Sequence, residues 1–182
     1  MMGRLLTWFY CLPLSGVLCL AALCTLVFLL LKGIWGERHW WNAALGLALL
    51  GCAALIVYTT LGGRERGSPG QAELKLFHSY RAVMNGGNGE ILRSNFMNAA
   101  LFYPAGVLAV SLLPERWPRG CRWLLVLLVL AALSVGIEYR QYVCALGRAE
   151  VDDVFHNALG AVLGGLLGVG KIKPPAPGKN GA

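Results

Sequence analysis

Five long runs of apolar residues, separated by polar segments, dominate the pattern of this chain. A helix that crosses a membrane needs about 20 predominantly apolar residues. In hydrocarbon every backbone N–H and C=O must be paired, and a helix pairs them within the segment itself. The sequence therefore predicts an all-α fold, a polytopic transmembrane helical bundle with about five spanning helices, at residues 5–31, 42–61, 99–113, 123–139 and 154–169.

The first apolar run also has features of a signal peptide, because Arg4 precedes it. The run is longer than the apolar region of a signal peptide, and no clear A-x-A cleavage site follows it. We expect a retained signal anchor, which Pro13 would kink rather than end.

The composition indicates that lipid is the main solvent of the chain. Of its 182 residues, 57% are hydrophobic and 14% are charged, whereas soluble domains are about one quarter charged. The formal charge is +7, but no basic amphipathic stretch with interleaved aromatic residues supports nucleic-acid binding. We therefore expect the lipid bilayer as a partner and no nucleic acid. The six cysteines include no CxxC pair, so we interpret them as packing residues.

The charges of the connections give the predicted orientation. Basic residues are numerous on both sides of the bundle, but those in short connections count most toward orientation. The side that holds the short basic connections and the tail at residues 170–182 is therefore predicted to be cytoplasmic. The long loop at residues 62–97 and the acidic connection at residues 140–152 would then face outward. Trp35, Trp40 and Trp41 suit an interfacial aromatic belt.

Polar residues gather at the start of the last predicted helix. Asp153, His156, Asn157 and Gly160 follow an i, i+3, i+4, i+7 pattern, so they share one face of that helix. Placing an unpaired polar side chain against lipid would cost roughly several kcal/mol of free energy. This stripe is therefore expected to face protein or trapped water, opposite the end of the preceding helix.

The sequence thus predicts an ionisable pocket at the outer membrane face, made of Glu138, Gln141, Arg148, Asp152, Asp153 and Asn157. A structural interpretation is also open. Asp152 and Asp153 fit the first helical turn, where acids offset the macrodipole, and Arg148 would neutralise Glu138. A metal site of Glu138, Asp153 and His156 is the weaker alternative, because no HExxH-type spacing is present. We expect no metal and no cofactor.

Other positions have expected roles in helix packing. Asn98 is a candidate helix cap and equally a candidate pocket amide, while Pro104 would kink its helix and Gly106 would leave room at the kink. The last predicted helix also carries a ridge of small residues at Gly160, Gly164 and Gly168. Such a ridge lets another helix approach closely in lipid. We favour packing within the bundle and keep a helix-mediated oligomer as the alternative.

Three segments resemble the VanZ-like family of membrane proteins in order and spacing. They are residues 98–106 (NAALFYPAG), 134–141 (SVGIEYRQ) and 148–160 (RAEVDDVFHNALG), with residues 77–81 as a weaker extension. The sequence departs from the common pattern in its first apolar run and in His156, which stands where the family more often has an apolar residue. The resemblance implies a VanZ-like transmembrane domain at residues 42–169, after an anchor helix and loop at 1–41 and before a disordered basic tail at 170–182.

The resemblance also implies a small bacterial membrane protein of the cell envelope, since the family's namesake is associated with resistance to teicoplanin. Three hypotheses follow. The protein lowers the action of glycopeptide or lipoglycopeptide antibiotics, with the antibiotic or a lipid-linked precursor as its partner. Alternatively, it is a membrane enzyme in which Glu138 and Asp153 act as acid and base on a lipid headgroup or cell-wall precursor. In the third hypothesis it is an accessory protein that docks a helical partner on its glycine ridge.

Overall fold

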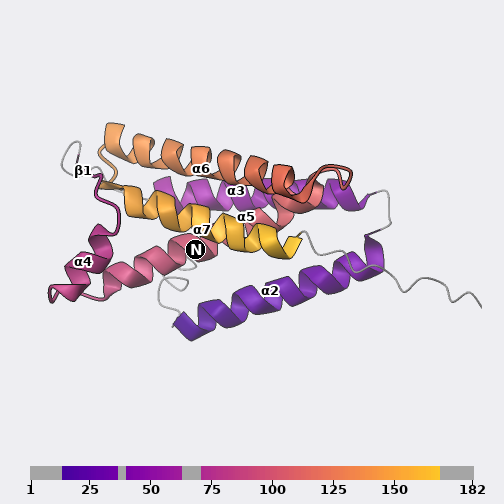
Figure 1. Ribbon diagram of the computed structural model, residues 1–182, viewed down its shortest axis with the longest axis horizontal. Coiled ribbons are helices and arrows are strands. Elements are labelled where there is room, and N and C mark those ends of the chain that lie inside the picture. The colour runs from indigo at the N-terminus through magenta and orange to yellow at the C-terminus, as the bar shows by residue number, and fades with distance from the viewer. Residues whose placement is uncertain (1–13, 37–39, 63–70, 169–182) are drawn as a thin grey trace, which may run out of the picture.

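The computed structural model describes residues 14–36, 40–62 and 71–168, with side chains from Leu23 onward. The start of the first predicted span, Pro13 and the basic tail at residues 170–182 lie outside the described residues. The described part is all-α apart from one pair of two-residue strands (Figure 1). The elements are α2 Leu14–Trp35, α3 Trp41–Leu61, β1 Ala72–Glu73, α4 His78–Met84, α5 Glu90–Leu112, α6 Arg119–Val143, β2 Ala149–Glu150 and α7 Val151–Gly168.

The long helices lie lengthwise beside one another, and α4 lies at one end of the bundle (Figure 1). That end also holds β1, β2, the last turn of α6 and the first turn of α7, and we call it the α4 end. α5 and α7 run in the same direction, because Gly160 and Gly164 of α7 meet Ala99 and Tyr103 of α5 in the same order. The strands pair in parallel, with Ala72 opposite Ala149.

Three helices of the described part are long and apolar enough to cross a membrane: α3, α5 and α6. α2 adds a shorter apolar stretch at Leu23–Trp35. The described helices therefore support a multi-pass membrane protein, while the predicted count of five spans is not confirmed. α7 falls outside the set because its first two turns carry Asp152, Asp153, His156 and Asn157. Asp152 and His156 contact the segment around α4, and Asn157 contacts Ser134 of α6.

The helix boundaries follow local sequence signals. α6 begins directly after Pro118, whose fixed φ suits the residue at a helix start. α5 begins at Glu90 and contains Pro104. The prediction that Asn98 caps this helix is wrong, because the helix starts two turns earlier in the polar segment that precedes the apolar run. Asn98 lies inside α5 instead.

The core is apolar and centres on α5. Its buried residues include Ile56, Phe102, Val110, Val126, Leu130 and Ile137. Beside this core, α7 lies so close to α5 that a Cβ on Gly160 or Gly164 would overlap a backbone carbonyl of α5. Gly106 of α5 is equally close to the carbonyl of Ala161. The glycine ridge therefore lies against α5 of the same chain rather than on the outer surface.

Candidate functional site

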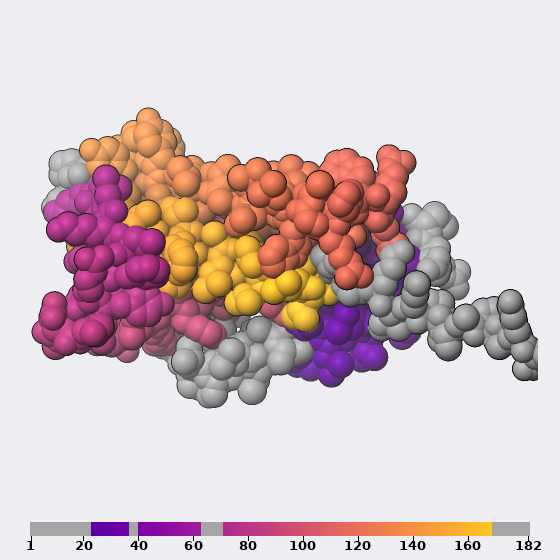
Figure 2. Space-filling view, viewed as in Figure 1, coloured from indigo at the N-terminus to yellow at the C-terminus, as the bar shows by residue number. Residues whose placement is uncertain are grey.

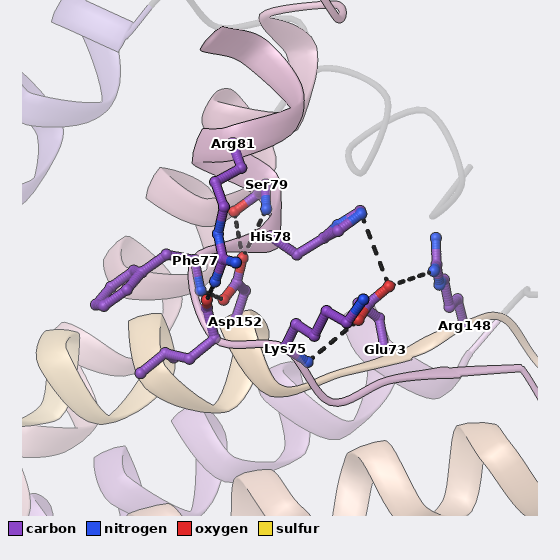
Figure 3. A network of polar contacts seen from close by, with 9 residues as sticks. Glu73, Lys75, Phe77, His78, Ser79, Arg81, Arg148 and Asp152 are labelled. Atoms are coloured by element: carbon purple, nitrogen blue, oxygen red, sulfur yellow. Dashed lines mark hydrogen bonds and ion pairs between the residues drawn. The ribbon is translucent and has the colours of Figure 1, made fainter. Parts of the chain in front are cut away.

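The Asp152 carboxylate joins the first turn of α7 to the segment around α4 (Figure 3). Its Oδ1 accepts a hydrogen bond of 2.5 Å from the backbone N–H of Phe77. Its Oδ2 accepts one of 2.9 Å from the backbone N–H of Ser79 and a further one from the Ser79 hydroxyl. Phe77 has a left-handed backbone with φ 61°, and this conformation directs both N–H groups at one carboxylate. Asp152 is 2% exposed, so the contact replaces solvation by water.

Two further contacts extend this cluster to α5 and along α7. Asn95 of α5 donates to the Ser79 hydroxyl oxygen at 2.7 Å, so that hydroxyl both donates and accepts. His156 lies one turn after Asp152, with its Nδ1 2.5 Å from the Asp152 carbonyl oxygen. Its Nε2 is 2.7 Å from the Tyr80 hydroxyl. Since a carbonyl only accepts, Nδ1 carries a proton, and in a neutral ring Nε2 accepts from Tyr80.

The exposed side of the α4 end carries an ion pair. Arg148 donates to a Glu73 carboxylate oxygen at 2.9 Å, and the His78 ring nitrogen lies 3.7 Å from the same oxygen. The other Glu73 oxygen accepts from the Lys75 backbone N–H (Figure 3). Arg148 thus pairs with Glu73 and not with Glu138, the partner expected from the sequence, because the strand pairing brings Glu73 beside Arg148.

The α6 side of the same end holds a second group of polar residues. Glu138, which is 8% exposed, accepts a hydrogen bond of 2.9 Å from the Glu150 backbone N–H. Gln141 donates to the Thr60 carbonyl of α3 at 3.1 Å. One turn deeper, Asn157 donates to the Ser134 hydroxyl at 2.8 Å. These contacts link α3, α6, β2 and α7 by polar groups inside an otherwise apolar bundle.

The predicted pocket residues thus gather at the α4 end but divide into separate sets. Asp152 contacts the segment around α4, whereas Glu138 contacts β2 and Gln141 contacts α3. The buried face of α7 begins at Asp152, while the neighbouring Asp153 is partly buried. Asn98 is also partly buried, one turn after Asn95.

Sequence reasoning missed several residues that complete these contacts: Glu73, Ser79, Tyr80 and Thr60. The weaker resemblance at residues 77–81 was a usable signal for Ser79 and Tyr80. Asn95 lies one turn before Asn98 on α5, and the 3.6-residue helical period would have placed both amides on one face. Thr60 contributes only a backbone carbonyl, so its side chain gave no signal.

The hydrogen bonds to Asp152 also determine the protonation state of its carboxyl group. Burial alone raises the pKa of this carboxyl, but the Ser79 hydroxyl, two backbone N–H groups and nearby His156 together outweigh burial and lower the pKa below its ordinary value. Asp152 therefore stays ionised and acts as an acceptor. A carboxylate that is fully engaged in this way is suited to holding α4 on α7.

Side chains that could hold a metal ion do not gather beside these contacts in the described part of the chain. No three His, Cys, Asp or Glu side chains there are placed to hold a metal ion, which removes the alternative site of Glu138, Asp153 and His156. A small hollow lies elsewhere, and apolar residues such as Val110, Trp123, Val126 and Leu127 line it.

Comparison with known protein families identifies the class of membrane protein to which this bundle belongs. The VanZ/LLP1 family matches residues 17–170, from within α2 to just beyond α7. The chain therefore belongs to the VanZ/LLP1 family. No curated protein and no solved structure matches the chain.

Proposed function

We propose that this VanZ/LLP1 protein lowers the action of glycopeptide or lipoglycopeptide antibiotics, teicoplanin in particular, at the outer face of the bacterial membrane. Membership of the family supports a role in the cell envelope. The polar residues of the α4 end are the proposed working surface. Their partner is the antibiotic or a lipid-linked cell-wall precursor.

The observation that carries this proposal is the mutual packing of the three motif segments: residues 98–106 pack against the α7 segment, which also bonds to residues 134–141 at the α4 end. Asn157 and Ser134 form one buried contact, and Glu138 and the Glu150 backbone form another. Buried polar groups at membrane depth are functional candidates, because each must be paired to offset the loss of water. The motif residues thus support one another and present Arg148, which is partly exposed, at the surface.

The polar geometry favours binding over catalysis. Asp152 is fully engaged by donors from α4, and Glu138 accepts from a backbone N–H. The donors around Asp152 stabilise the ionised form of that carboxyl and lower its pKa, whereas a general acid must be protonated near neutral pH. An enzyme that acts on a lipid headgroup is therefore not a second proposal. It is one outcome that the following experiment distinguishes.

The test is expression in a sensitive Gram-positive host, with an empty vector as the control. Teicoplanin and vancomycin susceptibility would be measured at matched membrane expression, together with the lipid-linked precursor pool. We expect protection against teicoplanin that exceeds protection against vancomycin, with no new lipid species. Absence of protection by well-expressed protein would contradict the proposal. A changed precursor chemistry would favour the enzymatic alternative.

A further inference from the structure

The segment that leads into α4 exposes apolar side chains outside the candidate spans. Leu74 is 80% exposed and Met84 is 85% exposed, and Leu76 and Phe77 are also exposed. These residues lie between β1 and the start of α5, a region that connects helices rather than crossing the bilayer. Exposed apolar residues that gather in one segment mark a contact with lipid or with another protein.

Two aromatic side chains of this segment pack against α7. Tyr80 and Met84 lie four residues apart on α4, so they share one face of that helix, and Phe77 directly precedes the helix. The Phe77 ring packs edge-on against Phe155 of α7, with the ring centres 5.2 Å apart. Tyr80 stacks on His156 with its hydroxyl at the ring nitrogen. The segment therefore continues the surface of α7 instead of projecting away from the bundle.

That surface of α7 is apolar along its length. Phe155, Leu159 and Leu163 are exposed at i, i+4 and i+8, so they form a stripe along the helix beyond the aromatic rings. In Figure 2, the β1–α4 segment covers one end of the molecule and lies directly beside the first turns of α7. Aromatic rings at the end of an apolar helical stripe match the boundary between hydrocarbon and headgroups.

The opposite end of the bundle carries a matching aromatic group. Trp35, at the end of α2, packs with Trp40, just before α3, at a ring-centre distance of 5.8 Å. Trp117, between α5 and α6, is also exposed. α3, with 21 residues between these two ends, has about the length of the hydrocarbon core. The two aromatic groups thus lie roughly one membrane thickness apart.

Cationic side chains accompany the apolar ones. Lys75 lies between Leu74 and Leu76, and it is exposed. Arg81 lies on α4, is exposed, and donates to the Leu76 carbonyl. Long basic side chains beside interfacial aromatic rings extend toward lipid phosphates, while their aliphatic stems remain on apolar surface. This combination of charge and apolar area fits an anionic lipid surface.

We propose that residues 74–84 form an interfacial anchor that lies in the headgroup layer of the membrane. Its exposed apolar side chains, Leu74, Phe77, Tyr80 and Met84, enter the upper hydrocarbon, and Lys75 and Arg81 contact lipid phosphates. The Asp152 contacts hold the anchor to α7, so it fixes the depth of the α4 end in the bilayer. This inference does not depend on the proposed antibiotic role.

Spin labels at single cysteines test the anchor directly. The full chain, with its six cysteines replaced by alanine and its helicity checked, would carry one label at Leu74→Cys or at Met84→Cys. Asn88→Cys in the α4–α5 connection is the aqueous control, and Leu128→Cys, on the exposed face of α6, is the hydrocarbon control. The protein would be placed in phosphatidylcholine vesicles with and without phosphatidylglycerol. Collision with oxygen and with a water-soluble nickel reagent then reports depth.

We expect the labels at positions 74 and 84 to lose access to the nickel reagent relative to position 88 and to show less oxygen contact than position 128. Phosphatidylglycerol should reduce nickel access further, and Lys75→Gln combined with Arg81→Gln should remove that added effect. Arg116→Gln at the other end is the matched charge control. Nickel access at 74 and 84 equal to that at 88 would overturn the proposal. Shielding from both reagents would also overturn it, because it would indicate a protein partner.

Discussion

Asp152 accepts a hydrogen bond of 2.9 Å from the backbone N–H of Ser79, a residue 73 positions earlier in the chain. The same carboxylate also accepts from the Ser79 hydroxyl and from the Phe77 backbone N–H. One buried acid thus fixes the segment at α4 to the first turn of α7. The contact between Ser79 and Asn95 of α5 adjoins this carboxylate, whereas Glu138 and Gln141 are held by separate contacts.

Removal of the Asp152 carboxylate should destabilise the bundle more than removal of an exposed acid. Asp152→Ala leaves two backbone N–H groups and one hydroxyl without their acceptor in a buried site, which should cost about 3 kcal/mol. Thermal unfolding in detergent, followed by circular dichroism, measures the loss. Limited proteolysis should also cleave near α4 earlier in this variant than in wild type.

Glu90→Ala is the matched control for this prediction. Glu90 forms an exposed pair with Arg93 within one helix turn, and such pairs contribute roughly 0.5 kcal/mol. An Asp152→Ala protein as stable as Glu90→Ala would show that the carboxylate does not hold α4 in place.

The sequence predicts much of the fold because local patterns determine it. Long apolar runs define α3, α5 and α6, and the buried stripe on α7 follows from its helical spacing. The pairing of Asp152 with Ser79 could not be predicted from local pattern, because no periodicity specifies which distant backbone groups meet a given acid. Arg148 illustrates the same limit. Its partner Glu73 lies in the long loop, and the two-residue strands that align them are too short to leave a pattern.

The close approach of α7 to α5 gives a second prediction. Gly164→Ala should destabilise the bundle by about 2 kcal/mol, because the added Cβ would overlap the Tyr103 carbonyl and force the helices apart. Gly136→Ala on α6 is the control, since that Cβ would meet nothing within 4 Å. Thermal unfolding of both variants in the same detergent measures the difference in stability between them. Equal stability would mean that the glycine ridge is not in close contact.

The lowered pKa of Asp152 predicts how its contribution varies with pH. Asp152 lies in the first turn of α7, outside the three candidate spans. Because its pKa is lower in the folded protein than the ordinary 3.8, the ionised form stabilises the fold at pH values above that ordinary pKa. This contribution should be lost as the pH falls below roughly 4 and passes through the folded-state pKa.

The difference in melting temperature between wild type and Asp152→Asn isolates this effect from other titrating groups. We expect a constant difference from neutral pH to about pH 5, and a smaller one near pH 3. A difference that stays unchanged over the whole range would mean that Asp152 does not titrate with a lowered pKa.

The Arg148–Glu73 pair is expected to contribute little to stability. The Arg148 side chain is 42% exposed, and ion pairs in contact with water contribute less than about 1 kcal/mol. Arg148→Gln should therefore unfold within a few degrees of wild type, as measured by thermal unfolding. If Arg148 contacts the antibiotic or a precursor, the same variant should lose protection against teicoplanin at unchanged membrane abundance. A large loss of stability would instead assign Arg148 a structural role.

Teicoplanin susceptibility of Glu138→Gln tests the central claim most directly. This variant keeps the size of the side chain and an oxygen to accept the Glu150 N–H but removes the negative charge. Glu90→Gln, at the same end of the bundle and exposed, would be measured beside it at equal membrane abundance. The account predicts that wild type and Glu90→Gln protect a sensitive host, and that Glu138→Gln does not. Full protection by Glu138→Gln would contradict the assignment of the working surface to the polar residues of the α4 end.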